Sequence, residues 1–202
     1  MPTRVKICGI TRPQDGLAAA AAGAHAIGLV FHPASPRCVS IAKARDIVAA
    51  LPPLVSMVGL FVDASESEIR EVLAQVPLDL IQFHGAEPAQ DCRRFGRRYL
   101  KALHVRPGAD LAAAAAPYDD AAGLLLDAFV PGVPGGSGQT FDWAAVPADL
   151  PRPLLLAGGL DAGNAAAECI KRIWNARNRG YLRHSAADQR RAGHTNIERI
   201  AA

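Results

Sequence analysis

The sequence is poor in aromatic residues and carries little excess charge, and both shortages limit its possible partners. Phe, Trp and Tyr make up 5% of the 202 residues, and the formal net charge is +3. So small a charge offers no electrostatic basis for binding nucleic acid or an anionic membrane surface. Half of the residues are apolar and a fifth are charged, which is typical of a soluble globular protein. We therefore predict neither nucleic acid nor a membrane as a partner.

Paired cysteines and long hydrophobic runs are also missing. The four cysteines stand far apart, at positions 8, 38, 92 and 169, with no Cys-x-x-Cys pair and no metal-ligand spacing. This pattern predicts free thiols, no metal site and a reducing compartment, which we take to be the cytoplasm. The longest apolar tract, residues 17–31, is interrupted by His25 and two glycines. The start of the chain lacks a signal-peptide pattern, so we expect neither secretion nor a membrane span.

Short apolar runs alternate with helical segments along most of the chain. The alternation repeats roughly every 25 residues, which predicts parallel strands joined by helical crossovers. Seven or eight such units favour an α/β fold of the (β/α)8 TIM-barrel type, formed by residues 1–202 as a single domain. The alternative is a doubly wound open sheet, which more often has a Gly-x-Gly-x-x-Gly turn after its first strand. The predicted strands are 5–8, 26–31, 55–62, 78–83, 99–105, 123–127 and 154–157, and four predicted helices are 13–22, 41–51, 87–97 and 109–116, with a helical turn at 142–146. Residues 63–67 offer capping groups for a further helix that runs to about residue 75.

In a parallel barrel the residues just after each strand gather at one end, where active sites are built. Cys8 ends the first predicted strand, and Gly9 lets the backbone turn without a side chain at the mouth. Asp127 ends an apolar run and is placed to act as a general acid. Arg37 follows Pro36 in a loop and can bind a carboxylate through its guanidinium group. The other residues at this end are 32–36, Asp63, His84, His104, 135–138 and 158–159.

Each of these residues also has a purely structural interpretation. A free cysteine such as Cys8 is more often a small buried hydrophobe than a reactive group. Asp127 could cap a turn, Arg37 could be an ordinary surface residue, and His84 could be a hydrogen-bonded residue at a strand end. The two glycine clusters, 135–138 and 158–159, expose backbone N–H groups that can bind a phosphate. They could equally be flexible connections.

Seven segments together resemble phosphoribosylanthranilate isomerase, in the order and spacing of that family from residue 3 to about residue 168. The segments are KICGIT at 6–11, GLVF at 28–31 with SPR at 35–37, GLFV at 59–62, QFHG at 82–85, LD at 126–127, PGGSG at 134–138 with FDW at 141–143, and LAGGL at 156–160. The first segment is the most specific of the set.

The resemblance implies an Amadori rearrangement in tryptophan biosynthesis, without metal or cofactor. The substrate is N-(5-phosphoribosyl)anthranilate, a phosphorylated small molecule, and the product is 1-(2-carboxyphenylamino)-1-deoxyribulose 5-phosphate. The resemblance makes Asp127 the general acid that opens the sugar ring and Cys8 the base that removes the C2 proton. It places the anthranilate carboxylate on Arg37 and includes His84 among the substrate-binding residues. It assigns the phosphate to Gly136, Gly138, Gly158 and Gly159, and leaves both a monomer and a homodimer open.

The family pattern ends near residue 168. The family continues into an eighth strand and a loop of the type Asp-Val-Ser-Ser-Gly, whereas residues 169–193 contain no apolar run of strand length and are rich in Arg. We therefore predict an eighth strand that is atypical or missing. One explanation is a divergent segment that still supplies a poor strand. Another is a reading-frame slip near residue 169 that is compensated near residue 193.

Two other functions stay open at this point. One is a phosphosugar isomerase of histidine biosynthesis with the same fold, but such enzymes use a pair of aspartates, and Cys8 argues against it. The other is a catalytically impaired or inactive barrel that only binds phosphorylated ligands because its C-terminal segment is altered.

Overall fold

The protein is described by a computed structural model. The model describes residues 4–128, 146–147, 150–158 and 182–186, and for the last range it describes the backbone. All structural statements below concern these residues. The predicted helical turn at 142–146 lies almost entirely outside them.

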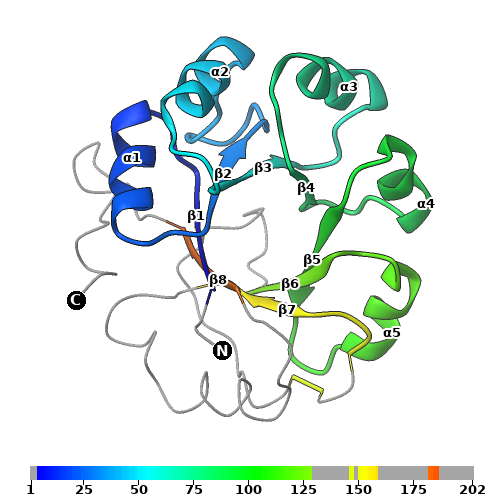
Figure 1. Ribbon diagram of the computed structural model, residues 1–202. Coiled ribbons are helices and arrows are strands. Elements are labelled where there is room, and N and C mark those ends of the chain that lie inside the picture. Colours follow the sequence, from blue (N-terminus) through cyan, green and yellow to red (C-terminus); the bar gives the residue numbers. More distant parts are fainter. Residues whose placement is uncertain (1–3, 129–145, 148–149, 159–181, 187–202) are drawn as a thin grey trace.

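Eight parallel strands close into a barrel in the order β1 to β8, which confirms the predicted fold. The helices of the described residues lie on the outside of the strands (Figure 1). The strands are β1 (Arg4–Cys8), β2 (Ala26–Val30), β3 (Ser56–Phe61), β4 (Leu80–Phe83), β5 (Tyr99–Val105), β6 (Gly123–Ala128), β7 (Leu154–Leu156) and β8 (Leu182–Ala186). The helices are α1 (Pro13–Ala21), α2 (Ile41–Ala50), α3 (Glu66–Gln75), α4 (Ala89–Cys92) and α5 (Leu111–Ala115), with 3-10 turns η1 (Arg93–Phe95) and η2 (Ala116–Tyr118).

Local sequence signals explain where several helices begin and end. Pro13 occupies the first turn of α1, and the chain leaves this helix through Gly23 at φ +88°. The Ser40 side chain accepts a hydrogen bond from the Lys43 N–H and caps α2. Ser65 and Glu68 form a reciprocal capping box at the start of α3. These caps fall where the sequence predicts helix starts.

The fourth helix is much shorter than predicted. The sequence predicts a helix over 87–97 with a solvated charged face, whereas α4 covers Ala89–Cys92 and continues only as the turn η1. The helix starts after Pro88, and Gly96 ends the turn at φ +60°. Glu87 is only 7% exposed, because its side chain points away from solvent into contacts described below.

Alternation along the strands separates two apolar layers. Ile7, Ile27, Ile81 and Leu124 belong to the large cluster between the strands and the helices. Val58, Ala102, Leu125 and Leu155 form a second cluster on the alternate strand positions, which face the barrel interior. Within the described residues, no helix is long and apolar enough to cross a membrane.

The eighth strand is present. Of the two predicted alternatives, atypical or missing, the first therefore holds, and the strand is atypical in its composition. β8 pairs with β1 from Arg4↔Leu182 to Cys8↔Ala186, and with β7 at Leu155↔Leu182 and Leu156↔Arg183. Backbone hydrogen bonding thus closes the barrel although the segment Leu-Arg-His-Ser-Ala lacks the apolar run of a typical parallel strand. The sequence leaves a missing strand open because no apolar run is present, whereas ladder pairing uses main-chain groups that every non-proline residue carries.

Candidate active site

Cys8 and Arg37 lie together at the carboxyl end of β1. Cys8 is the last residue of the strand and is 1% exposed. Gly9 follows at φ +84°, and a Cβ there would come within 2.6 Å of the Arg37 Cδ and Nη1 atoms. The Arg37 side chain therefore lies directly on the Gly9 backbone. Its Nη1 donates a hydrogen bond to the Cys8 carbonyl oxygen at 3.4 Å.

Across the barrel mouth, Asp127 contacts His84. Asp127 lies near the end of β6 and is 3% exposed, and His84 directly follows β4 with the same exposure. The His84 Nε2 atom lies 3.2 Å from the Asp127 Oδ2 atom, an ion-pair distance that does not satisfy hydrogen-bond geometry. The other oxygen, Oδ1, accepts a hydrogen bond from the Ala128 N–H at 2.9 Å. The carboxyl group is thus held from two sides.

Gln82 sets the orientation of the His84 ring. Its Nε2 atom lies 2.9 Å from the His84 Nδ1 atom, and both side chains are buried. With the amide nitrogen donating, Nδ1 accepts and Nε2 carries the ring proton toward Asp127. The two residues are separated by one position, so strand alternation places them on the same inner face of the barrel.

His104 completes the polar group at this side of the mouth. It pairs with Asp127 in the β5–β6 ladder, and its Nε2 lies 3.1 Å from the His84 carbonyl oxygen. Burial is the main cause that lowers the pKa of His104 below its ordinary value of 6.5. The folded state therefore favours neutral His104, and this contribution to stability is lost as the pH falls below 6.5.

Gly158 packs against the same carboxylate. It has φ +81°, and a Cβ there would lie 2.8 Å from the Ala128 nitrogen and 2.9 Å from the Asp127 Oδ1 atom. A side chain at this position would displace the acid predicted at β6. The structure thus gives Gly158 a packing constraint that the sequence did not reveal.

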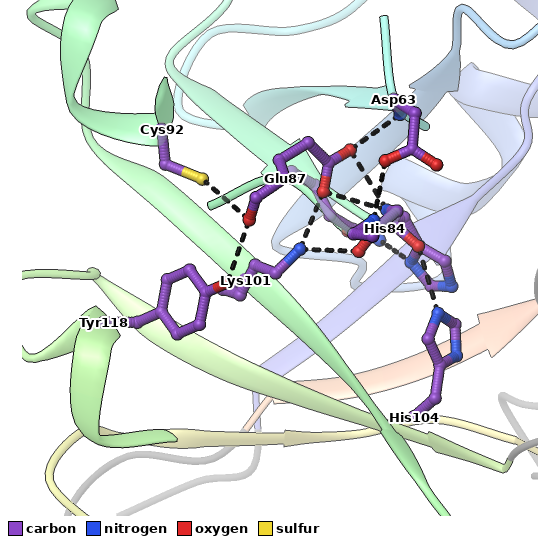
Figure 2. Close-up of polar contacts among 10 residues, drawn as sticks. Asp63, His84, Glu87, Cys92, Lys101, His104 and Tyr118 are labelled. Carbon is purple, nitrogen blue, oxygen red and sulfur yellow. Dashed lines mark hydrogen bonds and ion pairs between the residues drawn. The ribbon is translucent and has the colours of Figure 1, made fainter. Parts of the chain in front are cut away.

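A buried ion pair fixes the connection that carries His84. The Lys101 Nζ atom lies 2.7 Å from the Glu87 Oε2 atom and donates to the Gly85 carbonyl oxygen at 2.7 Å. Glu87 also accepts hydrogen bonds from the Gly85 N–H at 3.0 Å and the Asp63 N–H at 2.9 Å. Figure 2 shows the Lys101 and Glu87 side chains meeting beside His84. We call Asp63, Gly85, Glu87 and Lys101 the loop clamp.

The structure brings most of the predicted site residues to one end of the barrel. Cys8 and Arg37 lie on the β1–β2 side, and His84, Asp127 and Gly158 lie on the β4–β7 side. Gly136, Gly138 and Gly159 lie outside the described residues, so their predicted phosphate contacts stay predictions. In the part of the chain that the structure describes, no three His, Cys, Asp or Glu side chains gather as metal ligands.

Sequence reasoning missed the loop clamp. The sequence predicts a solvated helix face for Glu87, and Lys101 stands inside an apolar run, where its charge is a signal of a buried partner. Tyr118 was missed as well; its hydroxyl donates to the Glu87 carbonyl oxygen at 2.9 Å. These contacts join segments 14 to 31 positions apart, and residue spacing alone does not reveal such pairs.

Comparison with known proteins identifies one family. A family model described as N-(5'-phosphoribosyl)anthranilate (PRA) isomerase matches residues 5–177. The N-(5'-phosphoribosyl)anthranilate isomerase of Pseudomonas paraeruginosa is 63% identical over 170 residues, which cover 84% of this chain and 80% of that protein. The protein of the same name from Azotobacter vinelandii is 59% identical over 161 residues, covering 80% of this chain and 78% of that protein.

Solved structures agree with the sequence relatives. Phosphoribosyl anthranilate isomerase from Thermotoga maritima superposes with a TM-score of 0.84 at 33% identity, covering 99% of this chain and 96% of that one. A second structure of a phosphoribosyl anthranilate isomerase, in complex with reduced 1-(o-carboxyphenylamino)-1-deoxyribulose 5-phosphate, has a TM-score of 0.80 at 32% identity and covers 99% of this chain and 95% of that one.

Proposed function

The chain belongs to the N-(5'-phosphoribosyl)anthranilate isomerase family, and we propose that Cys8 and Asp127 perform the proton transfers of its reaction. The chain is an isomerase of tryptophan biosynthesis that rearranges N-(5-phosphoribosyl)anthranilate to 1-(2-carboxyphenylamino)-1-deoxyribulose 5-phosphate. The observation that carries the residue assignment is the placement of a buried thiol and a buried carboxyl group at the same end of one barrel.

Asp127 is the proposed general acid. It donates a proton to the ring oxygen of the sugar, the C1–O bond breaks, and the anthranilate nitrogen lone pair forms a C1=N iminium. The contact with His84 and the hydrogen bond from the Ala128 N–H hold the carboxyl group toward the mouth. Such pre-positioning lowers the entropic cost of proton transfer.

Cys8 is the proposed general base. The iminium makes the C2 proton acidic, and the thiolate removes it to leave an enolamine. The enolamine becomes the ketone product when its C2 hydroxyl loses a proton and C1 gains one, so the overall reaction is an isomerisation with no net loss of protons. Because β1 and β6 lie on different sides of the barrel, a substrate spanning the mouth can meet both groups.

The remaining assignments concern binding. Arg37, half-buried beside Cys8, is the proposed partner of the anthranilate carboxylate, since a guanidinium group matches a carboxylate in shape and charge. His84 is proposed to contact the substrate beside Asp127. Gly158, with Gly136, Gly138 and Gly159, is proposed to bind the phosphate. The reaction is proposed to need no cofactor.

The proposals for oligomeric state and cellular location are supported by the description of one structural neighbour and by the free cysteines. A Thermotoga maritima neighbour is described as mutually generated monomers of a dimeric enzyme of this kind. We propose a monomer or a homodimer here, which light scattering distinguishes. Cys8, Cys38 and Cys92 are free thiols. This supports the proposed cytoplasmic location, where thiols stay reduced.

Turnover of two isosteric variants tests the assignment. We expect Cys8→Ser and Asp127→Asn each to lower kcat by about 10²–10⁴-fold, the usual contribution of a general acid or base. Both should still bind the product analogue, reduced 1-(o-carboxyphenylamino)-1-deoxyribulose 5-phosphate. Cys92→Ser is the matched control, because burial raises the pKa of Cys92 to about 12 and the residue lies on α4, outside the barrel.

Three outcomes of this experiment are distinct. Normal turnover in Cys8→Ser removes the thiol from the mechanism, and normal turnover in Asp127→Asn indicates that this residue only caps the end of β6. Binding of the analogue without any turnover by the unaltered chain would favour the inactive barrel.

A further inference from the structure

Lys6 is a buried cation that has no hydrogen-bond partner among the described residues. Its side chain is 0% exposed and belongs to the largest fully buried side chains of the protein. Its Nζ atom makes no hydrogen bond in the described part of the chain. Burying an ammonium group without a compensating charge or hydrogen bond is strongly unfavourable. An anion beside the ammonium group would remove this cost.

The Cys8 thiol is placed to supply that anion. Lys6 and Cys8 are two positions apart on β1, so strand alternation directs both side chains into the barrel. Both also contact Gly28 on β2: the Cβ that Gly28 lacks would lie 2.6 Å from the Cys8 Sγ atom and 2.9 Å from the Lys6 Nζ atom. Two atoms that lie this close to one point are neighbours. Gly28 leaves the space in which they meet.

Among the described residues, the other charged and titratable groups near this pair come from one loop and from the strands across the barrel. Arg37 binds the Cys8 carbonyl oxygen from the β2–α2 loop, and His184 on β8 pairs with Lys6 in the ladder. On the far strands, the interior groups are His84, His104 and Asp127. The one carboxylate among them, Asp127, contacts His84 and its own backbone. The thiol is thus the acidic group that shares a contact point with the ammonium.

We propose that Lys6 is a positioning residue that holds Cys8 in the thiolate form through a buried ammonium–thiolate pair. This proposal rests on the proposed role of Cys8 as the base and explains how a buried thiol serves that role near neutral pH. The thiol proton leaves to solvent, and the thiolate later accepts the substrate C2 proton. An opposite charge within about 4–6 Å favours the charged form of a titratable group.

The pH dependence of kcat in Lys6→Met tests the pair. The rate should rise with pH as the thiolate forms, and in Lys6→Met this rise should occur about one to three pH units higher. Activity lost at neutral pH should therefore return in alkaline buffer. Ile7→Val, on the same strand but facing the helices, is the matched control and should keep the wild-type profile. A loss of kcat that is equal at every pH, or a change in KM alone, would overturn the proposal.

Ultraviolet absorbance of the thiolate supplies a second readout that needs no turnover. The absorbance of the wild type minus that of Cys8→Ser should already show the thiolate at neutral pH. The absorbance of Lys6→Met minus that of the double variant Lys6→Met, Cys8→Ser should show it only at higher pH. If Lys6→Met does not fold, Lys6→Gln and the wild-type titration still decide the question. Absence of the neutral-pH signal refutes the pair, whereas turnover of Cys8→Ser tests the proposed base by itself.

Discussion

At the scale of single residues, Gly158 links backbone conformation to the acid at β6. Two separate constraints act there: the left-handed backbone at φ +81° and the close approach to Asp127 Oδ1. Gly23 has a similar φ of +88°, but a Cβ there would meet nothing within 4 Å. The two glycines therefore separate backbone strain from displacement of the carboxylate.

We expect Gly158→Ala to lower kcat by about 100-fold, as a displacement of a catalytic group by about 1 Å can do. Gly23→Ala should leave kcat unchanged. Both variants should lose about 1–2 kcal/mol of unfolding free energy for a Cβ in the left-handed region. Gly158→Ala should lose more, because its Cβ would also lie 2.8 Å from the Ala128 nitrogen. Steady-state kinetics and urea unfolding measure the two effects. Equal kcat in the two variants would show that Asp127 tolerates the added methyl group.

At the scale of elements, the loop clamp determines how β4 leads into α4. The ion pair between Lys101 on β5 and Glu87 is 2% and 7% exposed, respectively, and Glu87 also binds the backbone of the two neighbouring loops. Figure 2 shows this network beside His84 and His104. The clamp thus connects the residues that follow β3 and β4 to Lys101 within β5, next to His84, which contacts the proposed acid.

Removing one partner of the clamp should lower the free energy of unfolding far more than removing a surface ion pair. We expect Lys101→Met to lower the free energy of unfolding by about 3–5 kcal/mol, because it leaves the Glu87 carboxylate buried without a counter-charge. The double variant Lys101→Met, Glu87→Gln should recover part of this loss. Arg70→Ala, which breaks an exposed pair with Glu66, should lower the free energy of unfolding far less, because solvent screens an exposed ion pair. Denaturant unfolding compares the three, and similar losses for Lys101→Met and Arg70→Ala would contradict the role of the clamp.

At the scale of the whole molecule, barrel closure depends on a strand of unusual composition. β8 pairs with β1 along its whole length but with β7 at only two positions. Its sequence, Leu-Arg-His-Ser-Ala, differs from the apolar runs of a parallel sheet. The family model ends at residue 177, before this strand begins.

Residues 169–193 can be replaced by a segment with an apolar strand and an Asp-Val-Ser-Ser-Gly loop. We expect this replacement to raise both Tm and kcat. Such a strand would bury more apolar area against its neighbours, and its loop would add N–H donors for the phosphate. Calorimetry and turnover measure the two effects. An unaltered chain that already melts cooperatively with the turnover of its relatives would refute the expectation. The nucleotide sequence tests the frame-slip hypothesis, which requires an intact family-like segment in another frame.

The sequence by itself determined the barrel, because the alternation of apolar strands and helices is a local property repeated along the chain. It also placed Cys8, Asp127 and His84 at one end of the barrel, since parallel strands bring their carboxyl ends together. Only the tertiary structure decided which groups share a contact. The Lys6–Cys8 neighbourhood needs the space left by Gly28 on another strand, and the burial of Glu87 needs Lys101. Closure by β8 was likewise decided by backbone pairing between distant segments, because main-chain hydrogen bonds do not depend on the apolar pattern that sequence analysis detects.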